Sequence, residues 1–468
     1  MWVVLTVVGA ALAWLLVGTG FANYDAAYSL VWGRDLAHGQ LPNYDVPVSP
    51  TPHPLSNLTG AILSPLGDGA ETALVVLAFL ALGALAVLTY ALGKRWFGTA
   101  AGVLAAAIVI TRQPILSFGA RAYLDIPYVV FVLAALATEA KKRKAGAPVL
   151  IWLGLAGLLR PEAWLFSAAY VGYLAWARHP GVLRLAALAA AAPVIWFAAD
   201  AIVTGDPLWS LTDTREGAQE LGRVTGLQNV PVTAPRRLGE ILREPVLLGA
   251  VAGLALGVAF LRDRVRLLLA AGLVALAAFC VLAAAGLPIL GRYLFFPAVL
   301  LAILCGAGAF AYRNLPPDHA WRRRAQIIGL LVLVAQIPFI PAQVDRIRDL
   351  GGALEIQTEI RDDLHDLATH PPLENGCQPL AVPNHRPVPL LALWLDRPPE
   401  HILSAQLVQI RSGQYLDPAT ARVLRNFTLD KRDPRRLTAQ VPPGFTKVAA
   451  NRSWVLYERC GRSLRSAR

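Results

Sequence analysis

The chain has 468 residues, of which 56% are hydrophobic and only 16% are charged. Soluble domains carry about 25% charged residues, so this composition excludes a soluble enzyme, a disordered chain and a collagen-like fibre. The formal net charge is +12, which in so apolar a chain indicates cytoplasmic loops rich in Lys and Arg rather than a nucleic-acid-binding surface.

Apolar segments recur along the chain and predict an α-helical, multi-pass membrane protein. A hydrocarbon core of about 30 Å is crossed by about 20 such residues. The first segment lacks the positively charged start of a signal peptide, so we expect it to be retained. The two short segments around Arg160 form either two tilted helices or one kinked helix. We expect about 11 transmembrane helices, at residues 1–20, 72–93, 98–111, 124–140, 147–159, 161–177, 181–203, 246–261, 267–287, 293–312 and 325–341.

Basic residues cluster in the short loops between these segments. Cytoplasmic loops are enriched in Lys and Arg, and all the clusters fall on one side if the segments around Arg160 count as two spans. We therefore expect a cell-membrane protein with a cytoplasmic N-terminus and an extracytoplasmic C-terminus. The clusters are Lys94 and Arg95; Lys141, Lys142, Arg143 and Lys144; Arg178; Arg262, Arg264 and Arg266; and Arg313, Arg322, Arg323 and Arg324.

Three longer segments lie on the opposite side, at residues 21–71, 204–245 and 342–468. The last has strand-like runs at 378–382 and 453–457 and a helix-like run at 388–395, separated by Pro and Gly. We expect a transmembrane domain over residues 1–341 and a small extracytoplasmic α/β domain over residues 342–468. In an oxidising compartment Cys377 and Cys460 can form a disulfide; otherwise they are two unpaired thiols.

The first outer loop places a carboxylate, Asp25, a few residues after the first span. The pattern from Asp25 to His38 suits an amphipathic helix on the membrane, which Gly39 can end. A carboxylate at this boundary is well placed to take a proton from an acceptor that meets a lipid-borne donor. The alternative is that Asp25 only caps the helix.

The order of residues in this loop resembles the first outer loop of GT-C glycosyltransferases. The closest likeness is to the protein mannosyltransferase-like and aminoarabinose transferase-like branch, and it covers about the first 300 residues. The resemblance implies that Asp25 is the catalytic acid of the family. Ala26 stands where many members have a second acid, and His53 stands in a motif that commonly has a basic residue. The residues that carry the likeness are Asp25, Tyr28, Gly39 to Pro42, Tyr44, Asp45 and Pro52 to Leu55.

Two further outer positions carry charged residues at helix starts. Asp125 either caps a helix or, as the resemblance implies, is a second acid near the active site that orients a substrate, and Arg121 beside it is a candidate phosphate contact. Arg160 and Glu162 lie at membrane depth, where charges are costly and usually functional or paired. They either face the outer cavity or form an interfacial turn.

Gly291-Arg292-Tyr293 precedes the tenth span on the outer side. It resembles the Arg-Tyr motif of the GT-C family, which implies that Arg292 lies near the lipid phosphate. A guanidinium offers a planar fork of donors to phosphate oxygens. The alternative is an arginine that extends to the interface.

Together these observations predict a membrane glycosyltransferase that moves a sugar from a polyprenyl-phosphate donor to a lipid, glycan or protein acceptor on the extracytoplasmic face. The reaction would invert the anomeric centre, with Asp25 as general base and Asp125, His53, Arg121, Arg292, Tyr293, Arg160 and Glu162 as substrate-binding residues. We expect no cofactor and no nucleic acid partner. A divalent metal is not favoured, because one isolated acid is a poor metal site. The alternative function is a polytopic transporter or lipid flippase with an outer accessory domain.

Overall fold

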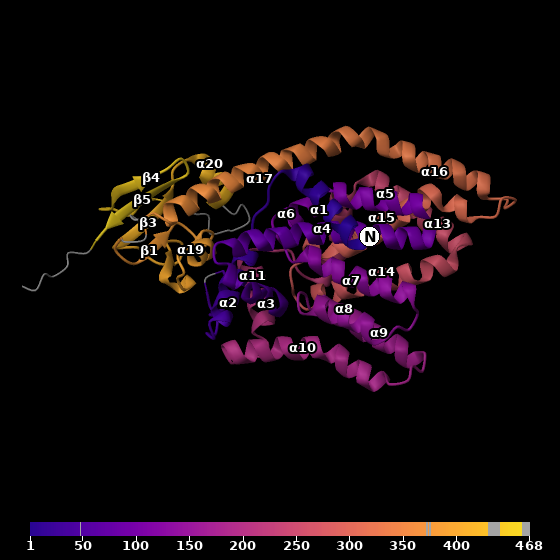
Figure 1. Cartoon of the computed structure of the whole chain (residues 1–468), viewed down its shortest axis with the longest axis horizontal. Helices are drawn as coiled ribbons and strands as arrows, with labels where there is room; N and C mark the ends of the chain where they lie inside the picture. The colour runs from indigo at the N-terminus through magenta and orange to yellow at the C-terminus, as the bar shows by residue number, and fades with distance from the viewer. Residues whose placement is uncertain (47, 371–372, 374–375, 429–439, 461–468) are drawn as a thin grey trace, which may run out of the picture.

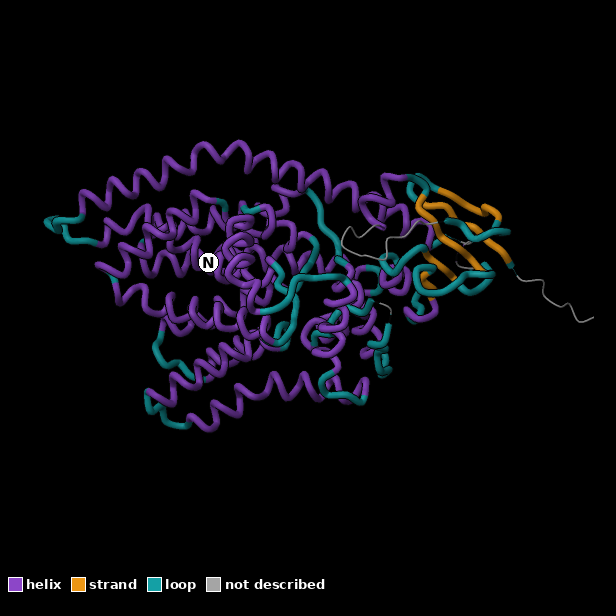
Figure 2. The backbone as a smooth tube through the Cα atoms, turned by 180° about the vertical axis from the view of Figure 1, so that it is seen from behind, coloured by secondary structure: helices purple, strands orange, loops and turns teal. Residues whose placement is uncertain are grey.

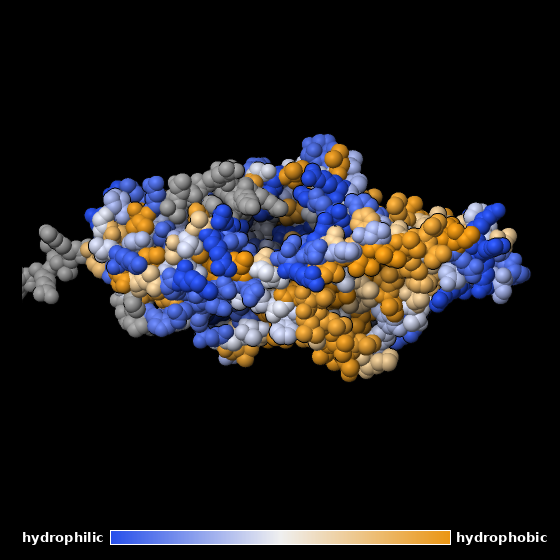
Figure 3. Space-filling view, turned by 90° about the horizontal axis from the view of Figure 1, so that it is seen from above, coloured by the Kyte–Doolittle hydropathy of each residue, from blue (hydrophilic) through white to orange (hydrophobic). Residues whose placement is uncertain are grey.

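The computed structural model describes residues 1–46, 48–370, 373, 376–428 and 440–460. A bundle of long helices forms most of the molecule, and a five-stranded sheet lies at one end of it (Figure 1). On the face seen in Figure 3 an apolar area covers much of the bundle, with hydrophilic surfaces at the sheet end and at the opposite end. This distribution is that of a multi-pass membrane protein.

Each apolar segment of the sequence coincides with a helix. Length and composition qualify five helices of the described chain as membrane spans, or up to seven when the bent pairs α5–α6 and α12–α13 each count as one. That number is lower than the predicted one in part because α1 and α8 have only 16 and 11 residues. The helices are α1 (Trp2–Val17), α4 (Gly69–Phe97), α5 (Thr99–Thr111), α7 (Asp125–Lys141), α8 (Ala147–Gly157), α9 (Glu162–Trp176), α10 (Val182–Thr204), α13 (Glu244–Phe260), α14 (Arg262–Ala284), α15 (Phe295–Phe310) and α16 (Arg322–Gln336).

The segments around Arg160 form two helices rather than one kinked helix. Trp164 at the start of α9 donates its ring N–H to Gly157 O at the end of α8. Tyr170, further along α9, accepts from Gly146 N at the start of α8. The two helices are therefore antiparallel, and the turn between them lies at the same end as the start of α7.

Several basic loops meet at the end of the bundle away from the sheet. Arg264 donates to Trp96 O and to Asn314 Oδ1, and Asn314 donates to Phe97 O. These bonds bring the α4–α5, α13–α14 and α15–α16 connections together, as predicted from charge alone.

The longer connections fold into short helices at the sheet end of the bundle. The first outer loop contains α2 (Tyr24–Ala37), α3 (Pro54–Leu63) and η1 (Ser64–Leu66). The connection after α10 contains α11 (Trp209–Glu220), η2 (Leu227–Asn229) and α12 (Val230–Leu242). The remaining short helices in or beside the bundle are α6 (Gln113–Ala120), η3 (Gly291–Leu294), η4 (Ala311–Asn314) and η5 (Ile337–Phe339).

One long helical rod joins the bundle to the sheet. Helix α17 (Ile340–Ala368) continues α16 through η5, so that 47 residues from Arg322 to Ala368 are helical. The rod runs along the bundle and ends beside the strands (Figures 1 and 2). It crosses the predicted domain boundary after residue 341 without a break.

The C-terminal sheet is mixed and has the order β2-β1-β3-β5-β4. Strand β1 pairs parallel with β2 and β3, whereas β5 pairs antiparallel with β3 and β4. The indole of Trp454 is fully buried and donates to Ile360 O, which fixes the sheet to α17. The elements are β1 (Leu380–Val382), α19 (Val388–Trp394), η6 (Pro399–His401), β2 (Ile402–Ser404), β3 (Gly413–Pro418), α20 (Ala421–Val423), η7 (Leu424–Thr428), β4 (Thr446–Ala450) and β5 (Trp454–Arg459).

The structure joins Cys377 and Cys460 in a disulfide, across 83 positions of sequence and with a Cα–Cα distance of 5.6 Å. The bond ties the segment before β1 to the end of β5. Cys280 and Cys305, in α14 and α15, are free.

Candidate active site

Asp25 lies in the first turn of α2 and its carboxylate faces a cavity. The helix is capped by Asn23, whose side chain accepts from the backbone N–H groups of Asp25 and Ala26. Asp25 therefore does not act as the N-cap, and its side chain is 33% exposed. The sequence places the cap two residues before the acid, so that the carboxylate is left for the cavity.

The cavity has a volume of about 620 Å³ and lies between the ends of the helices that are nearer the sheet (Figure 1). Segments far apart in the sequence contribute to it: the starts of α2, α3 and α7, the α8–α9 turn, helix α11 and η3. Seven of the eight residues predicted for the site line it: Asp25, His53, Asp125, Arg160, Glu162, Arg292 and Tyr293.

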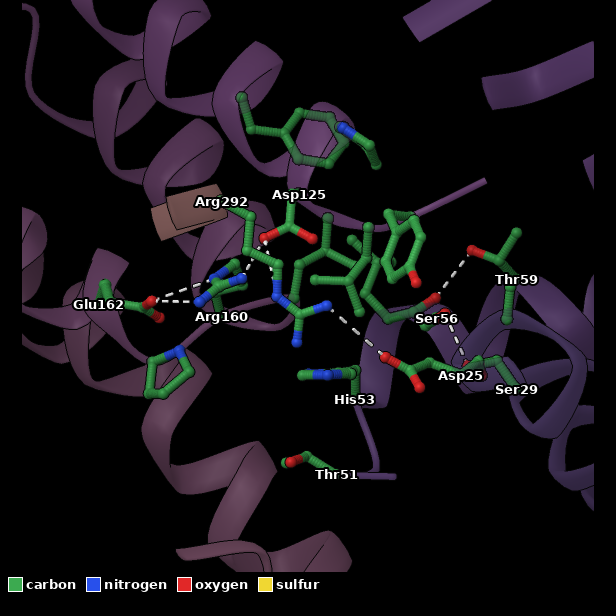
Figure 4. Close-up of a pocket in the computed structure, with 18 of the residues that line it drawn as sticks. Asp25, Ser29, Thr51, His53, Ser56, Thr59, Asp125, Arg160, Glu162 and Arg292 are labelled. Atoms are coloured by element: carbon green, nitrogen blue, oxygen red, sulfur yellow. Dashed lines mark hydrogen bonds and ion pairs between the residues drawn. The ribbon is translucent and has the colours of Figure 1, made fainter. Parts of the chain in front are cut away.

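Arg292 lies between the two aspartates (Figure 4). Its Nη1 is 3.9 Å from Asp25 Oδ2, and its Nε is 3.8 Å from Asp125 Oδ1. Both distances exceed a normal hydrogen bond, and Arg292 Nε has no hydrogen-bond partner among the described residues. The guanidinium therefore has donors available for an anionic group in the cavity.

Arg160 is held between two buried acids. Its Nη1 contacts Asp125 Oδ1, and its Nε and Nη2 lie 3.0 and 2.5 Å from Glu162 Oε1. The ring of Tyr293 packs 3.9 Å from its guanidinium carbon. A buried charge is costly unless it is paired, so these contacts explain how Arg160 and Glu162 persist at this depth.

The five charged side chains form a row of alternating sign: Asp25, Arg292, Asp125, Arg160 and Glu162. Asp125, Arg160 and Glu162 are buried, with side-chain exposures of 2, 8 and 7%. Asp25 and Arg292 are the exposed end of the row, at 33 and 21%. The reactive surface of the cavity is therefore this acid–guanidinium pair, and the buried members support it from behind.

His53 lies at the N-cap position of α3 and packs edge-on against Trp196, with ring centroids 5.4 Å apart. Burial, together with the positive charges of Arg160 and Arg292, lowers its pKa from 6.5 to about 3. The imidazole is therefore neutral at physiological pH. It offers the cavity a polar group without a charge.

Arg121 does not line the cavity, contrary to its predicted contact with phosphate. Its Nε and Nη2 donate to Gln357 Oε1 on α17, at 3.3 and 3.1 Å, and its Nη1 donates to Ser117 Oγ. The guanidinium thus faces α17, because the turn after α6 directs this side chain away from Asp125.

Several lining residues carried no motif in the sequence. Thr51 and Thr214 bond across the cavity at 2.6 Å between their hydroxyl oxygens, which links the first outer loop to α11. Asp200 near the end of α10 accepts from Ser210 N and Oγ at 3.1 and 2.8 Å. These pairs join distant segments, so only the fold brings them together.

An apolar branch of the cavity extends from the charged row along α4 and α7. Its lining includes Leu74, Leu77, Ala81 and Ala84 of α4, and Phe131 of α7. Leu74 and Ala84 are ten positions apart, a rise of about 15 Å at 1.5 Å per residue. The cavity therefore combines a charged outer end with an apolar groove that descends into the bundle.

Metal-ligating side chains gather elsewhere. Among the described residues, the group of three that lies within 4.8 Å consists of Cys377, Cys460 and Glu458, at the sheet. The disulfide occupies both sulfurs. In the cavity Asp25, Asp125 and Glu162 each lie beside an arginine.

Part of the chain matches a known protein family. Residues 49–200 match the family described as dolichyl-phosphate-mannose-protein mannosyltransferase. That segment includes His53, Asp125, Arg160 and Glu162 but neither Asp25 nor Arg292. No curated protein matches the chain at a significant level.

Solved structures match nearly the whole chain. ArnT from Cupriavidus metallidurans bound to undecaprenyl phosphate is 14% identical with a TM-score of 0.55, over 97% of each chain. The archaeal oligosaccharyltransferase AglB from Archaeoglobus fulgidus, in complex with an inhibitory peptide and a dolichol-phosphate, is 11% identical with a TM-score of 0.50, over 89% of this chain and 69% of that one.

The chain has the fold of ArnT and AglB, and residues 49–200 match a mannosyltransferase family, so the protein is similar to multi-pass membrane glycosyltransferases of the GT-C type. The resemblance seen in the first outer loop is thus confirmed. The solved structures show the fold, and the match over residues 49–200 to mannosyltransferases supports the enzymatic activity.

Proposed function

We propose that the protein transfers a sugar from a polyprenyl-phosphate donor to an acceptor hydroxyl, on the extracytoplasmic face of the membrane. The observation that carries this proposal is one cavity in which Asp25 and Arg292 face each other at the head of an apolar groove. A lipid-linked sugar matches this arrangement, because it consists of a sugar, then a phosphate and then a hydrocarbon chain.

The donor would lie with its prenyl chain in the apolar branch and its phosphate at Arg292. The apolar side chains of α4 and α7 that line the groove would remove this hydrocarbon from water. Arg292 supplies a fixed cation with open donors. In support, ArnT and AglB, which share the fold, are bound in their structures to undecaprenyl phosphate and to a dolichol-phosphate.

Asp25 would act as the general base. Its carboxylate takes the proton of the acceptor hydroxyl while that oxygen attacks the anomeric carbon. The bond from the anomeric carbon to the phosphate oxygen breaks, and the electron pair leaves with the phosphate. Attack opposite the leaving group inverts the anomeric centre.

Arg292 would stabilise the charge that grows on the departing phosphate. Because Asp125 is buried and close to Arg292, it fixes the guanidinium in this place. Arg160 pairs with Asp125 in turn, and Glu162 and the ring of Tyr293 contact Arg160. His53, which is neutral, can position the acceptor or the sugar by hydrogen bonding.

The positive-inside rule supports the proposed orientation. The basic loops gather at the end opposite to the cavity. With that end in the cytoplasm, the cavity and the sheet lie outside, where the disulfide of Cys377 and Cys460 is stable.

Mass spectrometry of cell-envelope glycans and lipid-linked sugars, with and without the gene, tests the proposal. We expect the deletion to lose one sugar modification and to accumulate its polyprenyl-phosphate-linked sugar. The matched control is the deletion strain carrying the wild-type gene. Identical glycans and lipid-linked sugars in both strains would contradict the proposal.

A further inference from the structure

The short segment between α1 and α2 determines where Asp25 lies. Asn23 caps α2 and is itself hydrogen-bonded to the turn after α6. Its backbone N and side-chain Nδ2 both donate to Arg121 O, at 3.0 and 2.8 Å. Phe21 N donates to Ala120 O at 2.9 Å. The first turn of α2 is thus fixed to the turn that follows α6.

Helix α17, from the C-terminal part of the chain, is connected to the same segment by two routes. Arg121, whose carbonyl holds Asn23, has its guanidinium bonded twice to Gln357 Oε1. A second route passes through Glu71, which accepts from Ala22 N at 3.1 Å and pairs with the buried Arg361 of α17. The guanidinium carbon of Arg361 lies 4.8 Å from the ring centroid of Phe21.

We infer that α17 is a positioning element for Asp25, acting through Gln357 and Arg121 on the cap residue Asn23. Neither Gln357 nor Arg121 lines the cavity, so neither contacts the substrate. Arg121, a conspicuous charge beside Asp125 in the sequence, thereby gains a role different from phosphate binding.

The position of Asp25 matters because general-base catalysis tolerates little displacement of the carboxylate. Proton transfer requires the carboxylate within about 2.6–3.2 Å of the acceptor hydroxyl, and a misplacement of about 1 Å can cost roughly 10²-fold in rate. Among the described residues, the Asp25 carboxylate has one ion pair, a long one of 3.9 Å to Arg292. Its position therefore depends on the backbone of α2, which the cap and α17 fix.

Gln357→Ala tests this inference in the full-length protein. We expect kcat to fall roughly 10-fold with an unchanged KM for the lipid-linked donor, because Arg292 and the apolar groove are not altered. Gln357→Glu restores an oxygen acceptor for Arg121 and should recover most of kcat. Both variants lose the bond from Gln357 Nε2 to Asn426 O, so their comparison isolates the link to Arg121.

Hydrogen exchange of the Asp25 and Ala26 amides gives a second readout that does not depend on turnover. It should be faster in Gln357→Ala than in the wild type and in Gln357→Glu. The matched control is Arg348→Ala, which removes an exposed ion pair with Asp345 on the same helix. If Gln357→Ala does not accumulate, Gln357→Met replaces it.

Wild-type kcat and exchange in the alanine variant would overturn the inference, as would equal impairment of Gln357→Ala, Gln357→Glu and Arg348→Ala. The kinetic arm rests on the proposed function, whereas the exchange arm does not. A wild-type protein without transferase activity would refute the proposed function and leave the exchange comparison to decide this inference.

Discussion

Arg292 is the residue on which the two aspartates of the cavity converge. Arg160 makes contacts at bonding distance with Asp125 and Glu162, whereas the contacts of Arg292 are 3.8 and 3.9 Å long. Arg160 is therefore committed to the protein, and Arg292 keeps donors for a ligand. This difference separates a supporting arginine from a substrate-binding one.

Replacing Arg292 should abolish most of the activity. We expect Arg292→Gln to lower kcat/KM for the lipid-linked donor by about 10²–10³-fold, the usual cost of removing one donor to a developing anion. Steady-state kinetics in proteoliposomes measures this. The control is Arg236→Gln on α12, which removes an exposed pair with Glu240; equal effects of the two variants would refute the assignment.

His53 gives the protein a pH dependence of predictable sign. Its pKa is lowered from 6.5 to about 3 in the folded state, so between these values the unfolded chain binds a proton that the folded protein does not. The free energy of unfolding should therefore decrease as pH falls below 6.5. Thermal unfolding at pH 7 and pH 5 should show a smaller loss for His53→Gln than for the wild type. An equal loss in both proteins would be contrary to this expectation.

At the scale of single residues, the sequence predicted most of the cavity but not the direction of every side chain. From the order of motifs alone, Asp25, His53, Asp125 and Arg292 were assigned to one site. Arg121 was misassigned because a charged residue in a turn can point to either side of it. Asp200 and Ser210 were missed because their pairing depends on how α11 returns over α10.

At the scale of elements, glycines allow α13 and α15 to pack closely. A Cβ on Gly253 would lie 1.8 Å from Leu304 O and 2.7 Å from Gly308 N. Small residues permit such backbone approach between membrane helices. The contact matters for the site because α15 follows η3, which carries Arg292.

Gly253→Ala should therefore separate α13 from α15. We expect a loss of about 1–3 kcal/mol in stability, the usual cost of overpacking, and a lower midpoint of thermal unfolding in detergent. Gly172→Ala on α9 is the control, since a Cβ there meets nothing within 4 Å. Equal midpoints for the two variants would contradict the close packing.

Helix α17 is an element that the sequence analysis did not predict. The last apolar segment ends at residue 341 and a polar tail follows it, so the sequence predicted a domain boundary there. The helix continues through this point, because Pro338 and Pro341 lie in the first turns of η5 and α17, where a missing N–H is tolerated. The apolar helices were easier to predict because their composition alone requires a membrane.

At the scale of the whole molecule, the orientation in the membrane decides whether the cavity can serve an extracytoplasmic acceptor. Asp318 lies in the exposed α15–α16 connection and Lys447 on the exposed strand β4. With a membrane-impermeant maleimide on intact cells, Lys447→Cys should be labelled and Asp318→Cys should be labelled only after permeabilisation. The opposite pattern would invert the orientation and place the cavity in the cytoplasm.

The overall arrangement was predictable in outline because charge and hydropathy act over whole segments. The gathering of basic loops at one end of the bundle, the position of the loops at 21–71 and 204–245 at the other end and a C-terminal sheet all follow from composition along the chain. The packing of the sheet on α17, with Trp454 donating to Ile360 O, requires contacts between residues about a hundred positions apart, which no local pattern encodes.

The turnover of Asp25→Asn in proteoliposomes, with the lipid-linked donor identified from the deletion strain, tests the central claim most directly. The substitution keeps the shape of the side chain and removes the base. We predict a loss of about 10²–10⁴-fold in kcat, with wild-type amounts of folded protein and retained donor binding, and partial activity in Asp25→Glu. Turnover of Asp25→Asn within about twofold of the wild type would contradict the role of this carboxylate in general-base catalysis.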